Sequence, residues 1–192
     1  MKESFEKLLW ERICSQARVI LQRPENYCRL KDSYDHRATA SLRLRSEPTF
    51  GVSRSVSVLA SRRELGDAGF EAVMAVWNKR YDERRILDPV QSLALVGQPD
   101  IKPTIDFRVG YVADEKVSQF LAHLATLKVG SFKLRPSLCI DCTEWSCEFN
   151  DGSSAISLSW INDGPGNWSS FTKIVNNFLD ESEKTLSFFS EN

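Results

Sequence analysis

The 192-residue chain has few of the residues, and lacks the motifs, on which recognisable catalytic sites depend. It contains two histidines, His36 and His123, and no nucleophile motif of the G-x-S-x-G type. It also lacks the phosphate-binding loop G-x-x-x-x-G-K-[ST] and a G-x-G-x-x-G turn after a strand. Because nucleophilic catalysis needs a base beside the attacking serine or cysteine, the sequence favours a protein that is not an enzyme.

Long apolar runs are missing as well. No apolar stretch reaches the roughly 18 residues that a membrane-spanning helix needs. Glu3, Glu6 and Glu11 interrupt the N-terminal segment, so it does not have the apolar region of a signal peptide. We therefore expect a cytoplasmic protein, in which the five cysteines are free thiols.

Three of the cysteines, Cys139, Cys142 and Cys147, lie close together in the sequence. Tetrahedral zinc needs a second ligand pair beside a C-x-x-C pair, and the two histidines lack the required spacing. If residues 138–149 are extended, Cys139 and Cys142 point to opposite faces, and Cys139 and Cys147 lie about 27 Å apart. The sequence therefore predicts packed thiols, with no metal and no cofactor.

Hydrophobic periodicity predicts four helices and several strands. The first predicted helix is 3–22, ending before Pro24. The second starts at Ser61 or Asp67, carries an apolar stripe from Phe70 to Tyr81 and ends before Pro89. The third is 114–130, capped by Asp114, and the last runs from Pro165 or Asn167 to Leu186. The predicted strands are 42–45 and 52–60, joined by a turn at 48–51; 91–96; 105–111; and the two runs on either side of Asp151-Gly152.

The Asp151-Gly152 pair predicts a hairpin with a two-residue turn. Cys147 then lies opposite Ile156, and one face of the hairpin is apolar. Glu144 and Glu148 lie on the other, polar face, which fits a half-buried hairpin.

The length suits one domain, and no Pro/Gly/Ser-rich linker or repeat divides residues 1–192. Strands in adjacent pairs, with helices between the pairs, indicate an α+β fold. We expect a single α+β domain with a mainly antiparallel sheet of about five to seven strands and about four helices packed on it.

The net charge of −1 is the sum of two opposite blocks. Residues 12–63 contain eleven Lys and Arg residues and four Asp and Glu residues, a net charge of +7. Residues 138–192 contain two basic and nine acidic residues, a net charge of −7. Either block can face a partner, or the two can pair within the fold.

Several readings of these charges stay open. Glu144 and Glu148 lie about 13 Å apart along a strand, too far for a glycosidase pair, so they form a solvated face or a face that binds a partner. The turn at residues 163–166 could offer backbone N–H groups to an anion, but Asp163 would repel a phosphate. Few aromatic residues accompany the arginines, so the sequence does not favour nucleic acid.

The last third carries a resemblance. Residues 145–153 (WSCEFNDGS), the strand ISLSW ending at Trp160, and the helix entry Gly164-Pro-Gly-Asn-Trp168 resemble a pattern in small bacterial α+β proteins. Among these are immunity proteins of polymorphic toxin systems. The resemblance covers about 50 residues. It implies a cytosolic protein that binds and occludes a cognate toxin without catalysis. Because immunity proteins share no functional motif, the resemblance assigns no site residue.

The sequence thus favours a non-catalytic protein-binding module, such as an immunity protein that neutralises a basic toxin. Its predicted partner-binding residues are Glu144, Glu148, Asp151 and Asp163. The alternative is a small-ligand-binding protein or an enzyme with a site assembled from scattered residues. A third hypothesis is nucleic-acid contact through the arginine-rich N-terminal half. The oligomeric state is left open.

Overall fold

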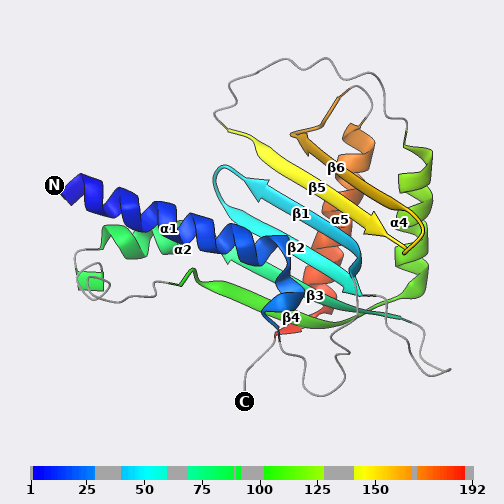
Figure 1. The fold of residues 1–192 in the computed structure, drawn as a ribbon, viewed down its shortest axis with the longest axis horizontal. Helices are drawn as coiled ribbons and strands as arrows, with labels where there is room; N and C mark the ends of the chain where they lie inside the picture. Colours follow the sequence, from blue (N-terminus) through cyan, green and yellow to red (C-terminus); the bar gives the residue numbers. More distant parts are fainter. Residues whose placement is uncertain are drawn as a thin grey trace.

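Seven antiparallel strands form one sheet in the order β6-β5-β1-β2-β3-β4-β7 (Figure 1). The computed structural model describes residues 2–28, 40–59, 69–88, 90–91, 102–127, 141–165 and 168–188, and the side chains of all of these except 2–5 and 40. The strands are β1 (Ala40–Pro48), β2 (Val52–Leu59), β3 (Phe70–Asn78), β4 (Ile105–Val112), β5 (Thr143–Asn150), β6 (Ala155–Ile161) and β7 (Ser187–Phe188).

Helices cover both faces of this sheet. They are α1 (Lys2–Gln22), α2 (Lys79–Leu87), α4 (Asp114–Thr126) and α5 (Ser169–Thr185), with a short 3-10 helix, η1 (Pro24–Asn26), after α1. Helix α1 lies on the front face and α5 on the back face as drawn in Figure 1. The four α-helices named here and the seven-stranded antiparallel sheet, all among the described residues, confirm the predicted α+β fold. Among the described helices, none is both long and apolar enough to span a membrane.

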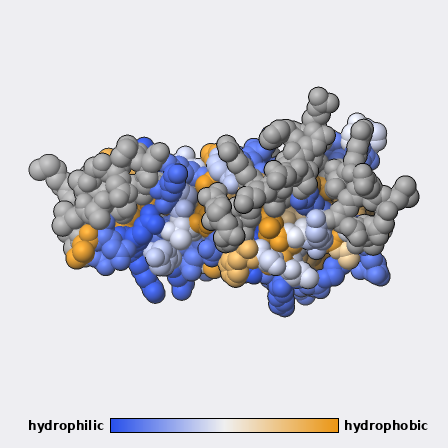
Figure 2. Space-filling model, turned by 90° about the horizontal axis from the view of Figure 1, so that it is seen from below, coloured by the Kyte–Doolittle hydropathy of each residue, from blue (hydrophilic) through white to orange (hydrophobic). Residues whose placement is uncertain are grey.

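The main core lies between the back face and the helices α4 and α5. It contains the back-facing residues of β1 to β3, and the aromatic residues Trp160, Trp168 and Phe171 pack around the start of α5. A second cluster on the front face joins α1 to β3 and α2, with Ile13 and Trp77 nearly fully buried. Seen from the β4–β7 side, the described surface shows small, separate hydrophobic areas among hydrophilic ones (Figure 2).

The predicted second helix is wrong over residues 70–78, which form the central strand β3, and only its last part, residues 79–87, is helical. Val73 to Trp77 are buried on both faces of the sheet, so the strand is a continuous apolar run. Such a run contains residues at helical spacing as well, and periodicity alone cannot separate the two structures. The helix that follows, α2, begins only at Lys79, and the Asn78 side chain accepts a hydrogen bond from the Tyr81 N–H at its start.

The two-residue turn predicted in the hairpin is also wrong. Asn150 pairs with Ala155, so four residues form the loop, and Cys147 lies opposite Leu158. The Asp151 carboxylate accepts hydrogen bonds from the N–H groups of Ser153 (2.8 Å) and Ser154 (2.7 Å) and closes this wider turn. Because the register shifts by two residues, the predicted apolar and polar faces of the hairpin are confirmed.

The ends of the elements differ in smaller ways. Helix α4 has Ala113 at its N-cap, with Asp114 in its first turn, and it ends at Thr126. Helix α5 begins after Trp168. The start signals at residues 61–67 and the strand at 91–96 lie outside the described residues, apart from Gln91, which is helical. The predicted first helix, the β1–β2 hairpin and β4 are confirmed.

One buried carboxylate fastens α2 to the sheet. Asp82 is fully buried and accepts hydrogen bonds from the Trp77 indole N–H and from the backbone N–H and hydroxyl of Thr104, each at 2.8 Å. The Arg85 guanidinium lies 3.3 Å from the same carboxylate. The side chain thus links the end of β3, the helix and the segment that enters β4.

Gly164 shapes the connection between β6 and α5. Its φ is +72°, a left-handed conformation that favours glycine. A Cβ atom here would lie 2.9 Å from the Trp168 Cβ and 3.0 Å from the Trp160 ring. The glycine therefore lets the chain turn directly against two buried tryptophans.

Candidate functional site

The hairpin β5–β6 is buried on one face and open on the other. Alternation places Trp145, Cys147 and Trp160 in the main core on the back. On the front, Glu144, Glu148, Ser157 and Ser159 are exposed and Ser146 is partly exposed. In the described part of the chain, α1 lies over the middle of the sheet and leaves the front of β5 and β6 uncovered (Figure 1). We call these five front residues the hairpin face.

The four predicted partner-binding residues fall into two groups. Glu144 and Glu148 share the hairpin face, as their spacing predicts. Asp151 lies in the hairpin loop and Asp163 follows β6, so they lie at opposite ends of the hairpin. A strand of this length separates them by roughly 23 Å. All four side chains are exposed.

Glu148 belongs to a chain of charged groups. The Arg43 Nη1 lies 3.4 Å from its carboxylate. The same guanidinium donates to the buried Glu25 from Nη2 (2.6 Å) and Nε (3.0 Å). The other Glu25 oxygen accepts a hydrogen bond from the Ser57 hydroxyl (2.6 Å), which fixes η1 against the sheet. Arg43 is therefore held mainly by Glu25, and it offsets only part of the Glu148 charge.

Glu144 lies in a corner that holds two carboxylates and three cations. It pairs in register with Glu47 of β1, so two like charges lie on adjacent strands. Arg18 (3.7 Å) and Arg45 (3.8 Å) lie beside the buried Glu47 carboxylate. Burial lowers the pKa of the nearby Lys79 ammonium, and the charge of Glu47 opposes that change. The cations of this corner thus neighbour Glu47, whereas Glu144 is exposed.

The two charge blocks of the sequence partly pair within the fold. Arg54 of the basic block forms ion pairs with Asp180 and Glu183 of α5, and Arg43 pairs with Glu148. Glu181 pairs with Lys116 at 2.8 Å. The acidic groups of α5 are therefore already engaged.

The Asp151 carboxylate stabilises the hairpin loop to which it belongs. Hydrogen bonds from the Ser153 hydroxyl and from the N–H groups of Ser153 and Ser154 lower the pKa of its carboxyl group. The residue stays exposed. Asp151 therefore carries its negative charge to lower pH than an ordinary aspartate, while it also holds the hairpin turn.

The cysteines and histidines that the structure describes form no recognisable centre. Cys147 is fully buried in the main core, and burial raises the pKa of its thiol to about 12. His123 is exposed on α4, and His36 and Cys139 lie outside the described residues. Within the described ranges, no three His, Cys, Asp or Glu side chains are grouped to hold a metal ion. Cys147 is therefore a packed core residue with an unreactive thiol.

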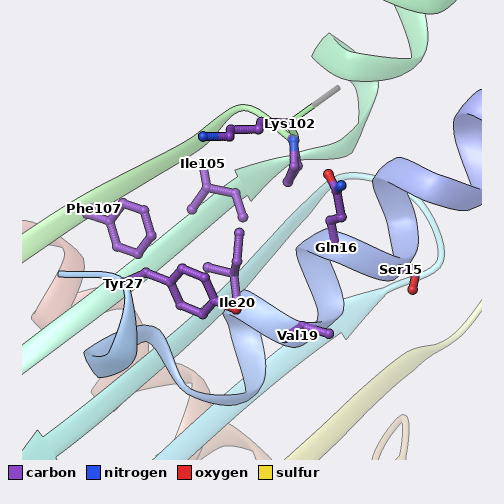
Figure 3. A pocket seen from close by; sticks show the side chains of 9 residues that line it. Ser15, Gln16, Val19, Ile20, Tyr27, Lys102, Ile105 and Phe107 are labelled. Atoms are coloured by element: carbon purple, nitrogen blue, oxygen red, sulfur yellow. The ribbon is translucent and has the colours of Figure 1, made fainter. Parts of the chain in front are cut away.

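A cavity of about 480 Å³ on the front face is a feature that the sequence did not indicate. Ile20 of α1, Tyr27 after η1, and Ile105 and Phe107 of β4 point toward it (Figure 3). The buried Gln16 amide oxygen at its wall has no hydrogen-bond partner among the described residues. Each of these residues looks like part of an ordinary apolar stripe, and segments some 80 residues apart meet only in the fold.

Fold and site together define an α+β protein with one antiparallel sheet and an open polar hairpin face. Comparison with protein-family models, with curated proteins and with solved structures gave no match. The proposals below therefore depend on the geometry and chemistry of this chain.

Proposed function

We propose that this chain is a non-catalytic protein-binding domain that docks a basic partner on the hairpin face. The observation that supports this most directly is that Glu144 and Glu148 are both exposed on a sheet surface that no described helix covers. Acidic groups of α5 are paired within the fold, whereas Glu144, Asp151 and Asp163 are exposed around the hairpin. Such a surface accelerates encounter with a basic partner and selects against acidic ones.

The resemblance of the last third to bacterial immunity proteins makes this proposal more specific. An immunity protein of the bacterial cytoplasm would bind a cognate toxin and cover its active surface. A basic nuclease toxin would complement the acidic hairpin through charge. The product of the gene next to the one encoding this chain is the first partner to test.

Reversing the charges of the hairpin face tests the proposal. We expect the immobilised wild-type protein to retain the neighbouring gene's product, and its affinity to fall as NaCl is raised. The E144K/E148K variant should bind at least about tenfold more weakly, because two attractive charges become repulsive. Biolayer interferometry across a salt series measures both effects.

The matched control is E11K/E83K, which makes the same charge change at exposed positions of α1 and α2. It should bind like the wild type, because Glu11 and Glu83 belong to helices and not to the hairpin face. Equal weakening of both variants would show that only net charge matters. Undiminished binding by E144K/E148K would contradict the proposal.

The cavity in Figure 3 supports a second candidate function, the binding of a small molecule. Its volume lies in the range typical of small-ligand sites, and its walls are mostly apolar. The unpartnered Gln16 oxygen would accept a hydrogen bond, and Lys102 at the rim would attract an anion. A small aromatic carboxylate with a donor group combines these properties.

A thermal-shift series with small aromatic carboxylates tests this candidate. A bound ligand should raise the Tm in proportion to the logarithm of its concentration once it saturates the site. The Val19→Trp variant fills the cavity and should abolish the shift. Val90→Trp, which changes an exposed valine outside the cavity, should preserve it. A shift that survives Val19→Trp, or no shift with any compound, would reject the cavity as a site for this class.

A further inference from the structure

In the part of the chain that the structure describes, strand β6 forms one edge of the sheet without the usual protection of an edge strand. Its seven residues, AISLSWI, contain no charged residue and no proline. Its ladder with β5 runs in continuous register from Asn150↔Ala155 to Glu144↔Ile161, without a bulge. Among the described residues β5 is its only strand neighbour. An uncharged, regular edge is a template on which another strand can pair.

The opposite edge of the same sheet is protected. There β4 carries Asp106 and Arg108, and the short strand β7 pairs with part of it. The Arg108 guanidinium also lies 4.3 Å from the centre of the Phe188 ring. The two edges therefore differ in charge and in cover, and β6 is the one suited to pairing.

We propose that β6 pairs antiparallel with β6 of a second copy of this chain, about a two-fold axis at Leu158. The two sheets then become one continuous sheet. Ser157 lies opposite Ser159 of the partner subunit, and Ile156 lies opposite Trp160 of the partner subunit, so polar residues meet polar and apolar meet apolar. The pairing covers apolar surface at this edge, where Ile156 is 39% and Ile161 is 47% exposed.

Charge favours a second copy as the occupant. Two-fold pairing of a strand with itself brings any charge on it close to the same charge on the other copy, and β6 has none. The nearest charge on the hairpin face, Glu148, lies on β5. The two Glu148 residues are three strand spacings apart and offset by two residues along the strand, a separation of about 16 Å. That distance exceeds the screening length of about 8 Å at physiological salt.

Like charges approach each other at the two ends of the paired β6 strands. Ala155 lies opposite Ile161 of the partner subunit, which brings the loop containing Asp151 toward the partner's Asp163. Salt screens this repulsion, so self-association should not weaken as NaCl is raised. The partner binding proposed above depends on attraction and weakens with salt. The two proposals are therefore independent and have opposite salt dependences.

Sedimentation velocity of the full chain over a concentration series tests the pairing. The wild type should form a dimer at high concentration. S157K/S159K places lysines opposite lysines of the second copy and should weaken the dimer by roughly tenfold or more. S157D/S159D should do the same. An equimolar mixture of the two variants should restore the dimer, because each lysine then faces an aspartate.

Circular dichroism and thermal unfolding check that both variants fold, since these serines are exposed on the front of the strand. Restoration by mixing supports the β6 interface, because an interface elsewhere gives no such complementation. A wild type that remains monomeric throughout the series overturns the proposal. A dimer that both variants retain, or one that mixing does not restore, overturns it as well.

Discussion

Replacement of Asp82 by alanine will lower the free energy of unfolding by about 3–5 kcal/mol. The carboxylate is fully buried and accepts three hydrogen bonds of 2.8 Å, two from Thr104 and one from Trp77. Alanine removes the acceptor of the buried Trp77 indole N–H and of both Thr104 donors, and the buried indole then bears its full desolvation cost. The Arg85 guanidinium loses its carboxylate partner but keeps its hydrogen bonds to the Thr104 hydroxyl and the Lys102 carbonyl oxygen. Urea denaturation followed by tryptophan fluorescence measures the loss.

Glu83→Ala is the control for this prediction. Glu83 neighbours Asp82 on α2 but is exposed, so its loss should change stability by no more than about 0.5 kcal/mol. A loss for Asp82→Ala no larger than that of Glu83→Ala would show that α2 does not depend on the buried carboxylate.

Gly164→Ala is expected to destabilise the protein by about 2–4 kcal/mol, from two separate causes. The φ of +72° is strained for any residue with a Cβ atom. The added methyl group also lies 2.9 Å from the Trp168 Cβ and 3.0 Å from the Trp160 ring, so the packed aromatic cluster must shift. Chemical denaturation measures the total, and near-UV circular dichroism reports the disturbance of the tryptophans.

Gly152→Ala separates the two causes. Gly152 in the hairpin loop has a φ of +88°, but a Cβ atom there meets nothing within 4 Å. This variant carries the backbone strain alone, about 1 kcal/mol. Equal losses for the two variants would mean that contact with the tryptophans adds nothing to the requirement for glycine at position 164.

The sequence correctly predicted the helices and strands that have one buried side and one exposed side. Helix α1 buries one residue in every four from Leu9 to Leu21, and apolar residues alternate with Asp106 and Arg108 in β4, so their periodicity identified them. The prediction for β3 was wrong because this strand is buried on both faces. Its continuous apolar run fits the spacing of a buried helix as well as that of a buried strand. The prediction of the β5–β6 hairpin was wrong only in its loop, because the Asp151 side chain stabilises a four-residue loop and not the predicted two-residue turn.

The candidate site, like the fold, was predictable from the sequence only where a local pattern determines it. Placement of Glu144 and Glu148 on one face needs only the two-residue period of a strand, which the sequence supplies. The pairing of Arg43 with Glu25 and Glu148, and the cavity between α1 and β4, depend on which strands become neighbours. Such contacts join residues far apart in the chain, and local patterns do not record them.

The position of β1 in the sheet has a consequence for how the chain is made. One side of β1 pairs with the adjacent β2, but the other pairs with β5, with Leu44 opposite Cys147. During synthesis from the N-terminus, β1 therefore emerges about 100 residues before its second neighbour. Until then it is a temporary open edge, and closing so distant a pair is slow. We expect the nascent chain to be most prone to aggregation in this interval and to be protected once residues 143–150 have left the ribosome.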